Sequence, residues 1–313
     1  FLLIHLVDIM AILIEKIKYF LSGKKITLSI ILLAIAGRII QLVYFFNIRV
    51  DGMYQHLATL NLLNGHGVSL GKALPEDLSS TVYEPLINWP PGYSLLLAPF
   101  YLLFNNNYIA AGLTLDIIAA VTLILVSRKI LRLYDTSTYL LNISTLITGF
   151  FIYYFYLIAS SDAIAISIFV AGLYFTILLI KSNRNWFKNI AAFAICFALC
   201  AYIKYLFFPV IIIVPVYLYI KGATVSSSHL KKVGIVTFAF IAVAISCLLL
   251  YQKSVSGSAG YISQPQRGFF PEHVLSAYPF IPASFIQPES IAIFTQQTKG
   301  LTFFLTRIFQ ILH

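Results

Sequence analysis

Long apolar runs recur along this chain, and several reach the roughly 20 residues needed to cross the hydrocarbon core of a bilayer. Hydrophobic residues make up 60% of the sequence and charged residues only 10%, which is outside the usual range of soluble globular proteins. In lipid, every backbone polar group needs an internal partner, and these runs lack the short alternating segments of a β-barrel. The sequence therefore predicts an all-α polytopic membrane protein.

Hydropathy places the predicted spans at residues 26–46, 108–126, 139–158, 163–180, 190–203, 206–220 and 233–251. The two spans that flank Lys204 are short, so a broken or re-entrant pair of helices is an alternative there. Residues 1–25 are expected to form an N-terminal interfacial segment, and residues 26–313 a single transmembrane domain. Because the chain begins without Met and stops inside an apolar run, we expect it to be a fragment.

Basic residues are concentrated in every second loop between the predicted spans. They are Lys24, Lys25, Arg128, Lys129, Arg132, Lys181, Arg184, Lys188, Lys221, Lys231 and Lys232. By the positive-inside rule these loops face the cytoplasm, which predicts a multi-pass protein of the plasma (inner) membrane with its long loops outside. The net charge of +10 comes largely from this asymmetry, so a nucleic-acid partner is not indicated. Long loops usually carry binding or catalysis, and we expect both on the outer side.

The first long loop begins with a segment that has one apolar face. Residues 51–64 place Met53 and Leu57 on the same side of a helix, and Gly65 supplies a stop signal. We expect this helix to lie on the outer membrane surface, where the Asp51 carboxylate can act as a general base toward a substrate arriving within the bilayer. The alternative is that Asp51 only caps the helix N-terminus.

A proline-rich segment, Trp89-Pro90-Pro91-Gly92-Tyr93, follows in the same loop. Its prolines and glycine fix a rigid turn, which leads into a short apolar helix over residues 94–104. That helix is too short to span a bilayer, so we expect it at the outer surface, with Trp89 and Tyr93 as interfacial anchors.

Three features of the chain are similar to those of the GT-C superfamily of integral-membrane glycosyltransferases. They are a first span that ends near the acidic Asp51, a surface helix that closes with Asn64-Gly65-His66-Gly67, and the proline-rich segment. In layout, residues 26–220 resemble protein O-mannosyltransferases and aminoarabinose transferases. The resemblance implies a GT-C-like helical bundle and an inverting transfer of a sugar from a polyprenyl-phosphate donor to a glycan, lipid or protein acceptor on the outer face.

The resemblance also implies roles for single residues. Asp51 matches the family's catalytic base, Asp162 a second acidic position that sets the acceptor or a metal, and Lys204 the basic position that contacts the lipid phosphate. The alternatives are that Asp162 is a solvated helix cap and that Lys204 is a side chain that snorkels to the interface. Gly52 stands where many members carry another acidic residue, so metal ligands are unknown and a divalent metal ion stays open as a cofactor.

Further substrate contacts are expected near Lys204 and in the outer loops. Tyr205 follows Lys204, Glu84 precedes the proline-rich segment, and Arg267 belongs to the second long loop. We expect Tyr205, Glu84 and Arg267 to bind substrate together with Lys204.

Two charges fall inside predicted spans. Arg38 and Asp116 each lie ~12 to 15 Å from the outer end of their span at ~1.5 Å rise per residue, where an unpaired charge would cost about 3 kcal/mol or more. We expect a structural ion pair between them, with a proton relay as the functional alternative. Intramembrane charges also mark substrate paths, so a transporter or flippase of a lipid-linked or polar substrate is the main competing function, and a non-catalytic scaffold is the second.

Overall fold

The computed structural model describes residues 15–44, 50–73, 81–86, 89–150, 161–181 and 185–256. Its helices are α2 (Lys24–Tyr44), α3 (Val50–Leu63), α4 (Gly92–Leu103), α5 (Tyr108–Arg132), α6 (Thr138–Phe150), α7 (Ser161–Lys181), α8 (Trp186–Ile203), α9 (Phe208–Thr224) and α10 (Ser228–Ser256). A short 3₁₀-helix, η2 (Tyr205–Phe207), joins α8 to α9. The chain divides into two compact units, Phe1–Ser246 and Cys247–His313.

Six helices within the described ranges are long and apolar enough to cross a membrane. They are Lys24–Tyr44, Tyr108–Arg132, Ser161–Lys181, Trp186–Ile203, Tyr205–Thr224 and Ser228–Tyr251. The chain is thus a multi-pass helical membrane protein, as its hydropathy predicts. The predicted span at 139–158 corresponds to α6 as far as Phe150, and the rest of that span lies outside the described residues.

The two spans beside Lys204 are longer than the sequence indicated. The helix before it has 18 residues and the η2–α9 segment after it has 20 residues, so each has the length of a full span. The break is confined to Lys204 itself, which is extended between α8 and η2 with φ −150° and ψ 115°. A re-entrant pair of half-helices is therefore the wrong reading of this region.

Helices α4, α5, α7 and α8 contribute to one apolar core. Its fully buried large side chains include Tyr93, Leu97, Tyr101, Phe193 and Phe197. Where helices α7 and α8 pack together, a glycine allows the close approach: a Cβ on Gly172 would lie 2.3 Å from the Phe197 ring. Small residues at helix contacts are the usual means by which membrane helices pack closely.

An antiparallel hairpin follows α3, and the sequence analysis did not predict it. Strands β1 (Ser69–Ala73) and β2 (Thr81–Pro85) pair with Ser69 opposite Pro85. The hairpin is anchored on α3 by a small cluster in which Ala58, Val68 and Leu86 are buried. Within the described residues, the helices are thus accompanied by this small β element in the first long loop.

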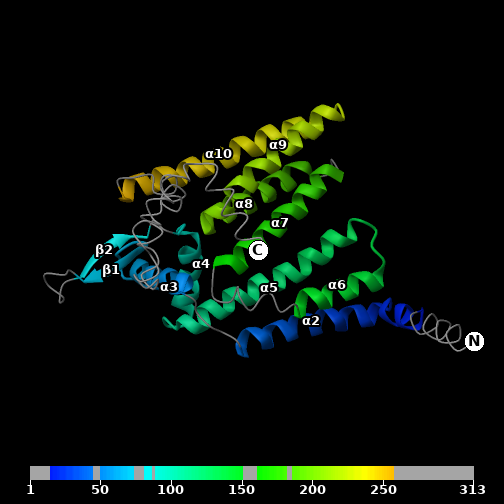
Figure 1. Ribbon diagram of the computed structural model, residues 1–313, viewed down its shortest axis with the longest axis horizontal. Helices are drawn as coiled ribbons and strands as arrows, with labels where there is room; N and C mark the ends of the chain where they lie inside the picture. Colours follow the sequence, from blue (N-terminus) through cyan, green and yellow to red (C-terminus); the bar gives the residue numbers. More distant parts are fainter. Residues whose placement is uncertain are drawn as a thin grey trace, which may run out of the picture. The chain divides into compact units, whose positions relative to one another are not determined.

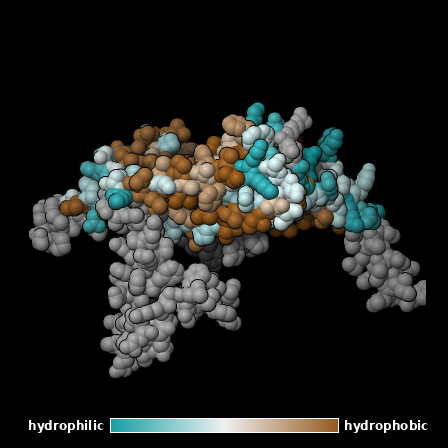
Figure 2. Space-filling view, turned by 90° about the horizontal axis from the view of Figure 1, so that it is seen from above, coloured by the Kyte–Doolittle hydropathy of each residue, from teal (hydrophilic) through white to brown (hydrophobic). Residues whose placement is uncertain are grey.

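The hairpin, α3 and α4 lie together near the end of the helices at which α7 begins and α8 ends (Figure 1). We call this the Lys204 end. At the opposite end, the basic end, Arg128 donates a hydrogen bond to Thr145 at 2.8 Å, and the Lys181 ammonium lies 4.2 Å from the centroid of the Tyr134 ring. Figure 2 shows hydrophobic side chains across the middle of one face and hydrophilic side chains gathered toward the basic end.

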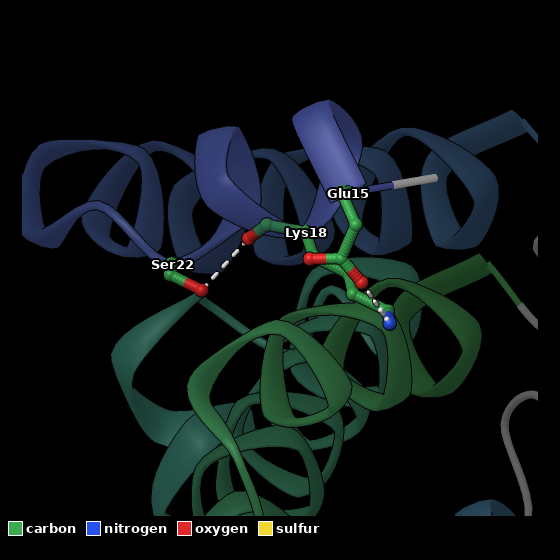
Figure 3. A network of polar contacts seen from close by, with 3 residues as sticks. All are labelled: Glu15, Lys18 and Ser22. Atoms are coloured by element: carbon green, nitrogen blue, oxygen red, sulfur yellow. Dashed lines mark hydrogen bonds and ion pairs between the residues drawn. The ribbon is translucent and has the colours of Figure 1, made fainter. Parts of the chain in front are cut away.

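Helical residues 15–21 precede α2. The Lys18 ammonium donates to the Glu15 carboxylate at 2.7 Å, and the Ser22 hydroxyl donates to the Lys18 carbonyl oxygen at 2.7 Å (Figure 3). These exposed polar contacts belong to the predicted interfacial segment, of which residues 1–14 lie outside the description.

Candidate functional site

Lys204 lies where the backbone leaves one helix and starts the next. Its N–H donates to the Cys200 carbonyl at 2.9 Å, and its own carbonyl accepts from the Phe207 N–H at 3.2 Å. Both backbone groups are therefore satisfied even though the residue is not helical. This satisfies the hydrogen-bond requirement of a break between two membrane-spanning helices.

The Lys204 ammonium forms an ion pair with the Asp162 carboxylate. The two residues are far apart in sequence, and they meet because α7 and α8 run antiparallel, so the first turn of α7 adjoins the last residue of α8. The side chains are 19% and 31% exposed. A partly exposed pair of this kind is accessible to a ligand and is only weakly stabilising.

A second link connects α3 to the start of α7. The Gln55 amide donates to the Ser161 hydroxyl at 3.5 Å, and Ser161 directly precedes Asp162. Helix α4 joins the same group because the Ser94 hydroxyl donates to the Gln55 carbonyl at 2.9 Å, and the Thr59 hydroxyl donates to the Ser94 carbonyl at 3.3 Å. The polar face of α3 thus packs inward, while Met53 and Leu57 on its apolar face are exposed.

The proline-rich segment packs directly against the Lys204 corner. A Cβ on Gly92 would lie 2.3 Å from the Tyr202 carbonyl oxygen and 3.0 Å from the Ile203 nitrogen, so only glycine allows this contact. The sequence predicts that this segment is a turn at the membrane surface. The structure shows that it also supports the end of α8, one residue before Lys204.

Tyr93 is not the interfacial anchor that the sequence suggested, because its side chain is fully buried. Burial raises the pKa of its hydroxyl well above the usual range, and the negative charges of Asp116 and Asp162 raise that pKa further. The hydroxyl therefore stays protonated near the Lys204 end. Among the residues that the structure describes, it has no hydrogen-bond partner.

His56 is a second buried polar side chain between α3 and α4. Its Nδ1 lies 2.6 Å from the Tyr101 hydroxyl oxygen. Burial lowers the pKa of His56 to about 4, so the imidazole is neutral at physiological pH. The burial of the polar side chains Gln55, Tyr93 and Tyr101 was not predicted, because their types and spacing match no motif.

The remaining predicted substrate residues are placed unequally. The backbone of Asp51 belongs to α3, one helical turn before Gln55, but its side chain and all of Arg267 lie outside the described part of the structure. Glu84 is exposed on β2 and is not a member of the ion pair. Tyr205 starts η2 immediately after Lys204. The neighbouring Tyr202 donates to the Ala244 carbonyl of α10 at 3.0 Å.

Arg38 and Asp116 are both buried, at 4% and 2% exposure, and both line one small cavity between α2 and α5. The Arg38 guanidinium also donates to the Gln41 amide oxygen at 3.2 Å. Their shared cavity is compatible with the predicted ion pair, which stays a prediction.

Within the described ranges, no three His, Cys, Asp or Glu side chains are grouped closely enough to hold a metal ion together. No family model matches the sequence, and no curated protein or solved structure gives a significant match.

Proposed function

We propose that this chain is a GT-C-like membrane glycosyltransferase that moves a sugar, with inversion, from a polyprenyl-phosphate donor to an acceptor at the outer face of the membrane. The observation that carries the proposal is the ion pair between Lys204 and Asp162 at the ends of two spanning helices. A partly exposed ammonium at the end of a spanning helix suits a lipid-linked phosphate, because the phosphate group needs a cation while the lipid tail stays in the bilayer.

The proposed reaction is a single displacement. The Asp51 carboxylate accepts the proton of an acceptor hydroxyl, and the acceptor oxygen bonds to the anomeric carbon of the sugar. The bond from that carbon to the phosphate oxygen breaks, and its electron pair leaves with the polyprenyl phosphate. Lys204 stabilises the charge that develops on this leaving group.

The arrangement of α3 and α7 supports a role for Asp51. The Gln55–Ser161 contact joins the first half of α3 to the helix start that carries Asp162. Because Asp51 precedes Gln55 by one turn of the same helix, its backbone belongs to the part of α3 nearest that junction. Basic residues at the opposite helix ends support an outward-facing site by the positive-inside rule.

The test is transfer from a polyprenyl-phosphate sugar in proteoliposomes. Asp51→Asn is expected to lose transfer by at least about 100-fold, in line with loss of a general base, while expression and thermal stability are unchanged. Asp135→Asn is the matched control, because Asp135 is exposed near the basic end of α5. Normal turnover by Asp51→Asn removes Asp51 from the mechanism.

A transporter or flippase is the second candidate, favoured by the buried Arg38 and Asp116 that line one cavity inside the spans. The same proteoliposomes separate the two functions. A glycosyltransferase makes glycosylated acceptor without moving labelled lipid between leaflets, whereas a flippase moves the lipid and forms no product.

A further inference from the structure

The cation that the proposed donor needs is already paired with a carboxylate. We propose that Asp162 competes with the lipid phosphate for Lys204, and that the Tyr93 hydroxyl receives the Asp162 carboxylate when the phosphate displaces it. This inference rests on the proposed function and adds a step that governs how tightly the lipid phosphate is held and how it leaves.

The ion pair has the properties of an exchangeable contact. Both side chains are partly exposed, at 19% for Lys204 and 31% for Asp162, and such pairs contribute little to stability. A lipid phosphate offers several acceptor oxygens and forms strong charge-assisted hydrogen bonds, so it can replace one carboxylate on the ammonium.

The chemistry of the reaction makes this competition matter most for the product. The donor is a phosphodiester with one negative charge. The product is a phosphate monoester, which carries ≈ −1.5 to −2 charge at pH 7 because its second pKa is ≈ 6. A Lys204 side chain that is not paired with Asp162 would therefore bind the product more tightly than the donor. Return of Asp162 to Lys204 would help the product to leave.

Two features of the structure can stabilise the Asp162 carboxylate once it is displaced from Lys204. Asp162 lies in the first turn of α7, where free backbone N–H groups and the helix dipole favour a negative charge. Tyr93 is fully buried, and its hydroxyl has no hydrogen-bond partner in the described part of the chain. The residues on either side of Tyr93 pack against this site: Gly92 adjoins the Tyr202 carbonyl, and Ser94 bonds to Gln55, which in turn bonds to Ser161 beside Asp162. Burial keeps the Tyr93 phenol protonated, so it remains a donor, and the charge of Asp162 adds to the raised pKa of that hydroxyl.

The experiment measures binding of polyprenyl phosphate to the protein in lipid nanodiscs. Asp162→Asn removes the competing charge, and we expect binding to be about threefold to tenfold tighter. Asp162→Glu keeps the charge and should bind as the wild type does. The gain should shrink as salt concentration rises. Polyprenol without phosphate tests the tail alone, and inorganic phosphate tests whether a free anion is sufficient.

Tyr93→Phe supplies the second arm. It is expected to weaken polyprenyl phosphate binding about threefold, the scale of one hydrogen bond, and to have no effect when Asp162→Asn is already present. A purely structural role for Tyr93 predicts the same loss in both backgrounds. If Asp162→Asn does not fold, Asp162→Ser takes its place in the cycle.

Unchanged or weaker binding by the neutral Asp162 variants overturns the competition, because it means that Asp162 positions Lys204 for phosphate instead of opposing it. This outcome is distinct from failure of the proposed function. If the proposed function is wrong, the wild-type protein transfers no sugar from a polyprenyl-phosphate sugar donor, whichever way the Asp162 variants bind polyprenyl phosphate.

Discussion

Gly92 is the most sharply constrained position around the site, and Gly92→Ala tests how far that packing holds Lys204 in place. The added Cβ would lie 2.3 Å from the Tyr202 carbonyl oxygen and 2.6 Å from its carbonyl carbon. A carbon and an oxygen without a covalent bond approach to about 3.3 Å, so α4 and the end of α8 must separate by ~1 Å. Because the clashing atoms are backbone, no side-chain rotation can relieve the overlap.

The cost should reach the upper part of the range for overpacking, about 1–3 kcal/mol. For a protein of this size that lowers the unfolding temperature by roughly 3–5 °C. The displaced backbone directly precedes Lys204, and a misplacement of ~1 Å in a catalytic group can reduce a rate by about 100-fold. We therefore expect Gly92→Ala to lose both stability and transfer, with a larger effect on transfer.

Thermal unfolding in detergent and sugar transfer in proteoliposomes measure the two effects separately. Gly23→Ala is the matched control, because a Cβ at Gly23 meets its nearest neighbour at an ordinary 3.5 Å. A Gly92→Ala protein that keeps the wild-type unfolding temperature would show that the contact with α8 yields easily. The packing argument for Lys204 would then be wrong.

Two further predictions concern buried polar groups. Burial lowers the pKa of His56 from 6.5 to about 4, so the unfolded chain takes up a proton below pH 6.5 that the folded chain does not. The stability that depends on neutral His56 is fully present above pH 6.5 and is lost as the pH falls toward 4, by up to about 3 kcal/mol. Unfolding of His56→Gln, measured as a function of pH, should therefore show a smaller loss of stability between pH 6.5 and 4. An identical pH profile for the variant and the wild type would contradict the assignment. For Arg38 and Asp116, either charge reversal alone should destabilise the protein by about 3–5 kcal/mol. The exchanged double variant should regain most of that stability in a detergent melt, unless the two charges are not paired.

Much of the secondary structure could be predicted from the sequence, because the signal for a membrane helix is local. A run of about 20 apolar residues is enough to predict a span, and α2, α5, α7 and α10 fall where hydropathy put them. The start of α3 and the apolar α4 were also expected. The hairpin was not predicted because β1 and β2 carry no alternating apolar pattern, and the residues of β2 are mostly exposed. Its anchoring depends on contacts with α3 that hydropathy does not encode.

In the candidate site, too, the sequence predicted where single residues lie but not which residues contact one another. Hydropathy and charge assigned Asp162 and Lys204 to one side of the membrane, since each interrupts an apolar run at a predicted helix end. The sequence did not show that they form an ion pair, nor that Tyr93 is buried nearby. Tyr202 illustrates the limit most clearly, because its position next to Lys204 does not reveal that its hydroxyl bonds to the Ala244 carbonyl of α10.

The sequence by itself determined that this chain crosses a membrane repeatedly, and which helix ends carry acidic or basic residues, because burial of apolar length in lipid is a property of each segment alone. The tertiary structure decided which of those ends meet. Lys204 meets Asp162 where α7 and α8 pack together, with Gly172 against the Phe197 ring farther along the same contact, and a glycine after two prolines brings α4 against the turn where α8 ends. Such contacts depend on shape across distant segments, and no single stretch of sequence contains them.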